Sequence, residues 1–526
     1  MRVLVCDPVA QEGIDFLRQQ PGLEVEARPK IAAAELAEII GDYHALVVRS
    51  ETKVTRELLE RAVNLKVIGR AGVGVDNIDV EAATARGIVV VNAPAGNTIA
   101  ATEHTIGLML ALARNIPQAS RSLQDGVWDR QRFIGVELRQ KVLGVIGLGK
   151  IGSEVARRAR AMEMRVLTYD PYVTSERAQH LGVELSELDR VLAEADFITV
   201  HLPLTPETRH LIGRDEIARM KKGVRLLNVA RGGIIEEQSL YEALVNGHVA
   251  GAALDVFEKE PATDNPLVAL DQVIATPHLG ASTTEAQVGV ALEVAREVIH
   301  ALAGEPVMNA VNIPAVKQEL VALLAPYLGL AEKLGQFASQ VAPGRTEGLE
   351  IAYNGELAQY EVTSLTNTFL KGFLRPILGD EVNYVNAPVV ARSRGIKVVE
   401  RKSTEMLDYA NLISVNIVME QGTREVAGTV VGKGEPRVVR FDGFSVDAAL
   451  KGLLLVIPHQ DQPRIIGPVG NLIGAQDVNI AGMQVGRKEI GGDAVMILAI
   501  DARVPKSTLE EIARIEGVRD VMEVEI

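Results

Sequence analysis

Residues 142–170, VLGVIGLGKIGSEVARRARAMEMRVLTYD, constrain the fold more than any other stretch of the chain. An apolar run ends at glycines spaced G-x-G-x-x-G, a helical segment follows, and a second apolar run ends in an aspartate. Glycines at this spacing let the backbone turn tightly and approach a pyrophosphate, which rests on the positive end of the helix. The aspartate is placed to accept hydrogen bonds from the adenosine ribose and would repel a 2′-phosphate. The stretch therefore predicts a Rossmann-like unit that binds NAD rather than NADP through Gly147, Gly149, Gly152 and Asp170.

Short apolar runs alternate with amphipathic helical segments through residue 305. Continuous Val/Ile/Leu strands separated by helices are typical of parallel sheets covered on both faces. The glycine motif begins a fresh set of strands near residue 141, so two such sheets are expected. A helical segment at 285–306, with Gly304 as its stop signal, returns to the first domain. The predicted units are a substrate-binding domain of residues 1–96 and 284–312 and an NAD-binding domain of residues 97–283.

The pattern changes after residues 311–316. Residues 317–447 mix helices with alternating strands, which indicates an α+β domain. Residues 451–526 follow the order βαββαβ, the ferredoxin-like split motif. The predicted fold class is thus α/β, with two doubly wound parallel-sheet domains followed by an intervening α+β domain and a C-terminal ferredoxin-like module.

Composition narrows the class of partner and the compartment. The 526 residues carry a formal net charge of −14 and no basic run, so a nucleic-acid partner has little electrostatic support. The single cysteine, Cys6, excludes an internal disulfide framework and fits a reducing compartment. The first residues enter an apolar strand with no leader, and no apolar stretch is long enough to span a bilayer. These features predict a cytoplasmic enzyme or sensor without a membrane partner.

Three polar residues follow predicted strands or lie in loops, where α/β enzymes place their chemistry. Arg231 surfaces directly after an apolar strand, and a buried arginine is costly unless it meets an anion. Arg231 is therefore expected to bind a carboxylate. His278 is expected to transfer the proton of a hydroxyl group, and Glu260 to orient His278 and keep it protonated. Taken singly, each also fits a helix-cap partner, a surface acid or an ordinary loop histidine.

Five segments, in order along the chain, resemble the D-isomer-specific 2-hydroxyacid dehydrogenases: GRAGVGVDNIDVEAATARGIVVVNAPAGNT, GLGKIG, NVARGG, ALDVFEKEP and TPHLGAST. The resemblance covers roughly residues 1–312. It implies that Arg231 binds the substrate carboxylate and that His278, paired to Glu260, is the proton donor. It also implies a set of cofactor contacts, with Lys150 and Ile151 at the pyrophosphate turn, Asp170 at the ribose, and Val229, Asp255, His278 and Gly280 near the nicotinamide.

Within that family the C-terminal module resembles an ACT domain, and the intervening region resembles that of long-form members acting on 3-phospho-D-glycerate. The resemblance implies NAD-dependent oxidation of 3-phospho-D-glycerate to 3-phosphohydroxypyruvate, the first step of L-serine biosynthesis. Arg49 and Arg70 end strands of the first domain and match positions that bind such a substrate. Arg130 and Arg132 are further candidates across a dimer interface, with solvated or interface charge as the alternative.

In related regulatory modules a small amino acid binds between two copies, which implies L-serine as effector and His459, Asp461 and Asn479 as its contacts. Arg464 stands where the family usually has glycine, which argues against serine binding because glycine lets the backbone approach the ligand closely. A purely structural, dimer-forming module is the alternative.

Two other functions stay open at this point. One keeps the chemistry and changes the substrate to glyoxylate, hydroxypyruvate or another small 2-hydroxyacid. The other is an NAD-sensing binding or corepressor protein in which turnover is secondary. The family resemblance also implies a homotetramer or homodimer, with an allosteric or assembly role for the intervening domain.

Overall fold

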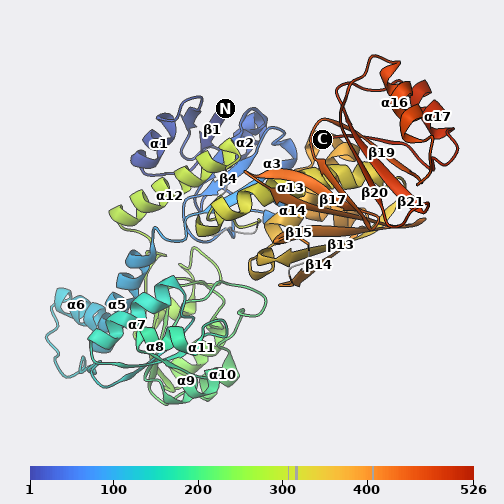
Figure 1. The fold of residues 1–526 in the computed structure, drawn as a ribbon. Helices are drawn as coiled ribbons and strands as arrows, with labels where there is room; N and C mark the ends of the chain where they lie inside the picture. The colour runs from blue at the N-terminus through green and yellow to red at the C-terminus, as the bar shows by residue number, and fades with distance from the viewer. Residues whose placement is uncertain (306, 314–317, 406–407) are drawn as a thin grey trace.

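The structure is a computed structural model that describes residues 1–305, 307–313, 318–405 and 408–526. Strands in these residues form a five-stranded, a seven-stranded, a six-stranded and a four-stranded sheet. Figure 1 shows the first sheet with its helices in blue, the second with its helices in cyan and green below it, and the last two in yellow to red at one side. The predicted α/β fold class is confirmed.

The first sheet is wholly parallel, in the order β2-β1-β3-β4-β5. Its strands are β1 (Arg2–Val5), β2 (Glu24–Ala27), β3 (Ala45–Val48), β4 (Val67–Arg70) and β5 (Val89–Asn92). Alternate side chains of these strands enter two separate cores, so both faces are covered. The covering helices are α1 (Gln11–Arg18), α2 (Ala33–Ile39), α3 (Arg56–Arg61), α4 (Val80–Ala85) and, from much later in the chain, α12 (Thr284–Ala303).

Helix α12 lies on the first sheet although it follows the whole second sheet in sequence (Figure 1). Val290, Val294 and Val298 of α12 share a core with strand residues of the first sheet. The chain therefore crosses between the two sheets twice, once before α5 (Thr98–Arg114) and once before α12.

The second sheet is also parallel, in the order β12-β11-β10-β9-β6-β7-β8. Its strands are β6 (Val142–Ile146), β7 (Arg165–Tyr169), β8 (Glu184–Leu185), β9 (Phe197–Val200), β10 (Val224–Asn228), β11 (Val249–Leu254) and β12 (Val273–Ala275). Its further helices are α6 (Ile116–Gln124), α7 (Lys150–Ala161), α8 (Ser175–Leu181), α9 (Leu188–Glu194), α10 (Arg214–Ala218) and α11 (Glu237–Val245). The strand order reverses at β6, and ligands of such sheets bind outside the carboxyl ends of the strands at this point.

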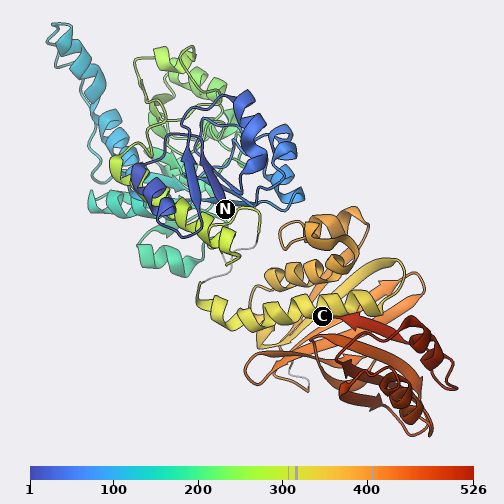
Figure 2. The ribbon, with the colours of Figure 1, turned by 90° about the horizontal axis from the view of Figure 1, so that it is seen from above.

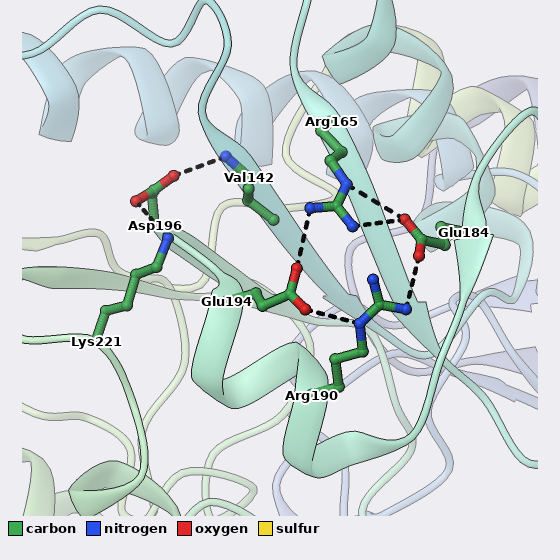
Figure 3. A network of polar contacts seen from close by, with 7 residues as sticks. All are labelled: Val142, Arg165, Glu184, Arg190, Glu194, Asp196 and Lys221. Atoms are coloured by element: carbon green, nitrogen blue, oxygen red, sulfur yellow. Dashed lines mark hydrogen bonds and ion pairs between the residues drawn. The ribbon is translucent and has the colours of Figure 1, made fainter.

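The amino ends of the same strands carry a network of charges (Figure 3). Arg165 at the start of β7 and Arg190 in α9 both pair with Glu184 and Glu194. Asp196, just before β9, accepts a hydrogen bond from the backbone N–H of Val142 at 2.8 Å. These contacts protect the edge of the sheet at β8 and lie at the end away from the glycine turn, so their role is structural.

The third sheet is mixed, in the order β14-β13-β15-β16-β17-β18, with β13 and β14 parallel and the other pairs antiparallel. Its strands are β13 (Thr346–Gly355), β14 (Lys397–Ser403), β15 (Asn411–Met419), β16 (Gly422–Val431), β17 (Glu435–Phe441) and β18 (Phe444–Ala449). The accompanying helices are α13 (Gln318–Val341), α14 (Thr363–Leu378) and α15 (Ala387–Ser393). The predicted start of this unit, residue 317, lies outside the described residues.

The fourth sheet is antiparallel, in the order β20-β21-β19-β22. The chain runs β19 (Leu453–Gln460), α16 (Ile466–Gly474), β20 (Ile480–Arg487), β21 (Asp493–Ile500), α17 (Lys506–Ala513) and β22 (Met522–Glu525), which confirms the predicted βαββαβ order. One face packs under α16 and α17, and the other joins the core of the third sheet and α13. The last two units are therefore one continuous structural half.

Figure 2 shows this half beside the half that contains the two parallel sheets. Residues before α15 contact the first sheet: Asn383 donates a hydrogen bond to the carbonyl oxygen of Gly87 at 2.8 Å, and Val385 joins the core there. No helix in the described part of the chain is both long and apolar enough to cross a membrane.

Candidate active site

The glycine turn between β6 and α7 has the geometry of a pyrophosphate site. Gly147 has a φ of 94°, and a Cβ on Gly152 would overlap the carbonyl oxygen of Gly147, so both positions need glycine. A Cβ on Gly149 would meet no protein atom within 4 Å, which leaves room for close approach of a ligand. Helix α7 begins at Lys150 without a side-chain cap on its first N–H groups. These donors and the helix dipole suit a diphosphate.

Asp170 lies beside this turn. Its carboxylate accepts hydrogen bonds from the backbone N–H groups of Leu148 at 2.8 Å and Tyr172 at 2.9 Å. Each carboxylate oxygen has two lone pairs, so both can still accept from a ribose hydroxyl. The residues present therefore fit an adenine dinucleotide, as the glycine spacing predicted.

The predicted histidine and glutamate are in contact. Nδ1 of His278 lies 2.9 Å from Oε2 of Glu260, and Oε1 of Glu260 accepts a hydrogen bond from the backbone N–H of Phe257 at 3.1 Å. Burial alone would raise the pKa of Glu260, but the hydrogen bond and charge of His278 outweigh it and hold that pKa below its usual value. Glu260 thus stays ionised beside the imidazole, and Nε2 of the half-exposed His278 remains for a substrate hydroxyl.

The loop of His278 is organised by Asp255, which is 1% exposed. Its carboxylate accepts hydrogen bonds from the N–H groups of Leu279 at 2.7 Å and Gly280 at 2.8 Å, on the residues that follow His278. Burial would raise the pKa of Asp255, but hydrogen bonds, first among them one from His104, lower it overall. A Cβ on Gly280 would lie 3.1 Å from Val229 and 3.2 Å from Asp255, so three of the four residues expected on the nicotinamide side lie together.

Arg231 emerges from the end of β10 next to the loop of Glu260. A Cβ on Gly232 would overlap the carbonyl group of Phe257, so glycine is required for the two loops to lie against each other. Nη1 of Arg231 donates to the carbonyl oxygen of Ala230 at 2.7 Å, and Nε lies 3.4 Å from the carboxylate of Asp76. Because Asp76 belongs to the first domain, this ion pair spans the two parallel-sheet domains.

Arg231 and Arg49 both lie within electrostatic reach of Arg70. Burial lowers the pKa of Arg70 to about 10, with further lowering by the positive charges of Arg231 and Arg49. Nε of Arg70 is buried and has no hydrogen-bond partner among the described residues. Neighbouring guanidinium groups with an unmatched donor would suit a multiply charged anion.

Several residues of the site were not predicted. Asp7, 2% exposed, accepts hydrogen bonds from the backbone N–H of Arg49 at 2.5 Å and the hydroxyl of Thr52 at 2.5 Å. Asn77 donates to the carbonyl oxygens of Arg49 and Thr52 at 2.7 Å each. Together they hold the loop of Arg49. An aspartate directly after the first strand was a usable signal for Asp7, whereas Asp76, Asn77 and His104 gave none without the fold.

Arg130 and Arg132 are exposed and are not brought to this site within the chain. Arg132 donates to Asp271 at 3.0 Å. Both belong to the segment that follows α6, and α6 is part of a helical arm that projects from the body of the molecule (Figure 2). Trp128 and Ile134 on this segment are 77% and 79% exposed.

The three candidate effector contacts do not meet within one chain. His459 is 2% exposed, and its Nε2 has no hydrogen-bond partner among the described residues. Asp461, nearby, accepts hydrogen bonds from Arg487 at 2.8 Å and the N–H of Gly491 at 3.2 Å. Asn479 precedes β20 at the opposite end of the sheet and donates to Asp501 at 2.8 Å.

Arg464, in the loop between β19 and α16, has a φ of 70°. This left-handed conformation is the one that glycine adopts without strain. The backbone conformation suited to glycine is therefore present although the residue is arginine.

Comparison with protein-family models gives two matches. Residues 106–280 match the model described as D-isomer specific 2-hydroxyacid dehydrogenase, NAD binding domain. Residues 323–442 match the D-3-phosphoglycerate dehydrogenase intervening domain.

Full-length relatives agree with these matches. The chain is 49% identical over 522 residues to D-3-phosphoglycerate dehydrogenase of Methanocaldococcus jannaschii, covering 99% of both chains. It is 46% identical over 520 residues to the Bacillus subtilis protein of the same name, covering 99% of this chain and 98% of the relative. Among solved structures, D-lactate dehydrogenase from Aquifex aeolicus complexed with NAD and lactic acid covers 60% of this chain and 100% of its own, with 29% identity and a TM-score of 0.53.

Proposed function

Because the chain belongs to the D-3-phosphoglycerate dehydrogenases of the D-isomer-specific 2-hydroxyacid dehydrogenase family, we infer that it oxidises 3-phospho-D-glycerate to 3-phosphohydroxypyruvate with NAD. This reaction is the first step of L-serine biosynthesis. The protein is thus an enzyme rather than an NAD-sensing binding protein.

The single observation that carries this assignment at the site is the clustering of Arg49 and Arg231 around the buried Arg70, with Arg231 next to the loop that carries Glu260. We propose that Arg231 binds the substrate carboxylate and that Arg49 and Arg70 bind its phosphate. Such a substrate is a multiply charged anion, and it would relieve the mutual repulsion of the guanidinium groups. A small unphosphorylated hydroxyacid would leave two of the cations unmatched.

In the proposed mechanism the glycine turn and Asp170 would hold NAD, which would supply the hydride acceptor. Nε2 of His278 takes the proton of the substrate hydroxyl, and Glu260 stabilises the imidazolium that forms. Arg231 fixes the carboxylate, which orients the carbon that carries the hydroxyl. Lys150 and Ile151 would contact the diphosphate, and Val229, Asp255 and Gly280 would line the nicotinamide side.

The test follows NADH consumption by the full chain with phosphohydroxypyruvate and, in parallel, hydroxypyruvate. Wild-type protein is expected to prefer the phosphorylated substrate. Arg49→Ala and Arg70→Ala should each reduce kcat/KM for phosphohydroxypyruvate by about tenfold or more, the scale of a lost charge-assisted contact. The same variants should change kcat/KM for hydroxypyruvate much less. Equal losses with both substrates would contradict the proposed phosphate site.

For the regulatory half, we propose that the C-terminal module is an ACT domain that binds L-serine between two copies of the chain. The unmatched Nε2 of buried His459 and the nearby carboxylate of Asp461 support a polar ligand at one end of the sheet. Asn479 at the other end would have to come from the second copy. Serine inhibition that is lost in His459→Ala would support the proposal; no serine binding by calorimetry would favour a structural module.

We also propose that the enzyme is a homodimer or homotetramer of the cytoplasm. The projecting arm with exposed Trp128 and Ile134 supports association, because large apolar side chains are usually covered in an assembly. The proposed units remain 1–96 with 284–312, 97–283, 317–447 and 451–526. Sedimentation of wild type and Trp128→Ala would test the role of the arm.

A further inference from the structure

His104 lies in α5, the helix that follows the first crossing between the two parallel-sheet domains. The first crossing packs against α12 just before this helix: a Cβ on Gly96 would lie 2.6 Å from the backbone nitrogen of Val290 in α12. His104 therefore lies on an element whose position depends on how the two domains are joined.

The imidazole of His104 contacts the support of the catalytic loop. Its Nε2 lies 3.2 Å from Oδ1 of Asp255 and 3.1 Å from Oγ1 of Thr276. The hydroxyl of Thr276 already donates its proton to Oδ1 of Asp255 at 2.6 Å, and a carboxylate only accepts. Nε2 of His104 must therefore carry a proton and donate it to this pair of oxygens.

Asp255 links His104 to the backbone around His278. Its carboxylate holds the N–H groups of Leu279 and Gly280, and its own carbonyl oxygen accepts from the N–H of His278 at 2.9 Å. A buried carboxylate that loses a donor can rotate or recruit another group, and the loop attached to it would move accordingly.

We propose that His104 is a positioning residue for the reaction: by donating to Asp255 and Thr276 it fixes the loop that carries His278 relative to helix α5. It couples the placement of the proton-transferring imidazole to the junction of the two domains. The proposal rests on the proposed role of His278, but it concerns a residue that need not touch substrate.

The test compares His104→Leu, which removes the donor, with His104→Gln, whose side-chain amide can place a donor near the position of Nε2. With phosphohydroxypyruvate and NADH, kcat should fall about 10- to 100-fold in His104→Leu, as expected when an outer partner of a functional group is lost. KM for the substrate should change little, because the three arginines are intact. His104→Gln should recover most of kcat.

His180→Leu is the matched control, since this histidine is exposed on α8 and is not among the partners of Asp255 or Thr276. Unchanged kcat in His104→Leu would overturn the proposal. It would also be overturned if kcat fell together with the melting temperature and His104→Gln did not restore kcat. His278→Ala is measured in parallel. Full activity in that variant would refute the role of His278 itself, whereas an inactive His278→Ala with a fully active His104→Leu would refute only the role of His104.

Discussion

The imidazole of His278 depends on two carboxylates that act in different ways. Glu260 pairs with the ring itself, whereas the buried Asp255 holds the backbone on either side of the ring. The first relation is predictable from residue types, because a histidine and a glutamate in neighbouring loops are a common acid–base pair. The second depends on backbone N–H groups that have no signature in a sequence.

Replacing His278 by alanine should lower kcat by about two to four orders of magnitude, the usual contribution of a positioned acid–base group. Dissociation of NADH, followed by its fluorescence, should be nearly unchanged because the glycine turn and Asp170 remain. A kcat within threefold of wild type would contradict the assignment of His278 as the proton-transferring residue.

His201, directly after β9, predicts an acid sensitivity of the folded state. Burial lowers its pKa from 6.5 to about 4. Between these values the unfolded chain binds the proton more readily, so stability falls as the pH drops from 6.5 towards 4. Lowering the pH from about 7.5 to about 5 should cost about 2 kcal/mol through this group alone.

Thermal melts of wild type and His201→Gln at the two pH values would measure this effect. The variant should lose less stability on acidification than wild type. His180→Gln, at an exposed position on α8, serves as the control and should behave as wild type. Equal losses in all three proteins would show that other groups dominate the acid response.

At the scale of elements, two glycines in the turn from β6 to α7 are required for different reasons. Gly152 is needed for the turn itself, since a side chain there would overlap the carbonyl group of Gly147. Gly149 has no such neighbour, so its value lies in the approach of the cofactor. Both belong to one motif in sequence, and only the packing distinguishes them.

The two alanine variants should therefore differ. Gly149→Ala is expected to fold with a melting temperature close to wild type while KM for NADH rises about tenfold or more, the cost of a lost close approach. Gly152→Ala should lower the melting temperature as well, because backbone atoms must shift. Melts and NADH titrations of both variants give the comparison. A Gly149→Ala protein with unaltered NADH affinity would contradict this division of roles.

At the scale of the whole molecule, all proposed catalytic residues lie before residue 281, and the helix that completes the first domain, α12, ends at Ala303. The second half has its own core and touches the first sheet through Asn383 and Val385. The parallel-sheet domains, which carry the proposed catalytic residues, and the second half thus have separate cores and meet at these residues.

Deleting residues 317–526 should leave kcat with phosphohydroxypyruvate within about threefold of wild type, because the two parallel-sheet domains keep their own cores. Any response to L-serine should disappear. The matched point variant Asn383→Ala keeps the second half and weakens only its contact with Gly87. A truncated protein that folds, judged by a cooperative melt, but does not turn over would show that the second half is needed for catalysis.

The sequence by itself determined the two parallel sheets, the βαββαβ module, the cofactor turn and the pairing of His278 with Glu260. The first three are encoded locally, by the period of apolar residues or by glycine spacing, whereas the pairing of His278 with Glu260 followed from the family resemblance. The tertiary structure decided the rest. It brought Asp76 to Arg231, Asn77 to the loop of Arg49 and His104 to Asp255, across 28 to 155 residues of chain. It also placed Asn479 away from His459. Such contacts depend on how whole sheets and helices pack, and no local pattern in a single sequence records them.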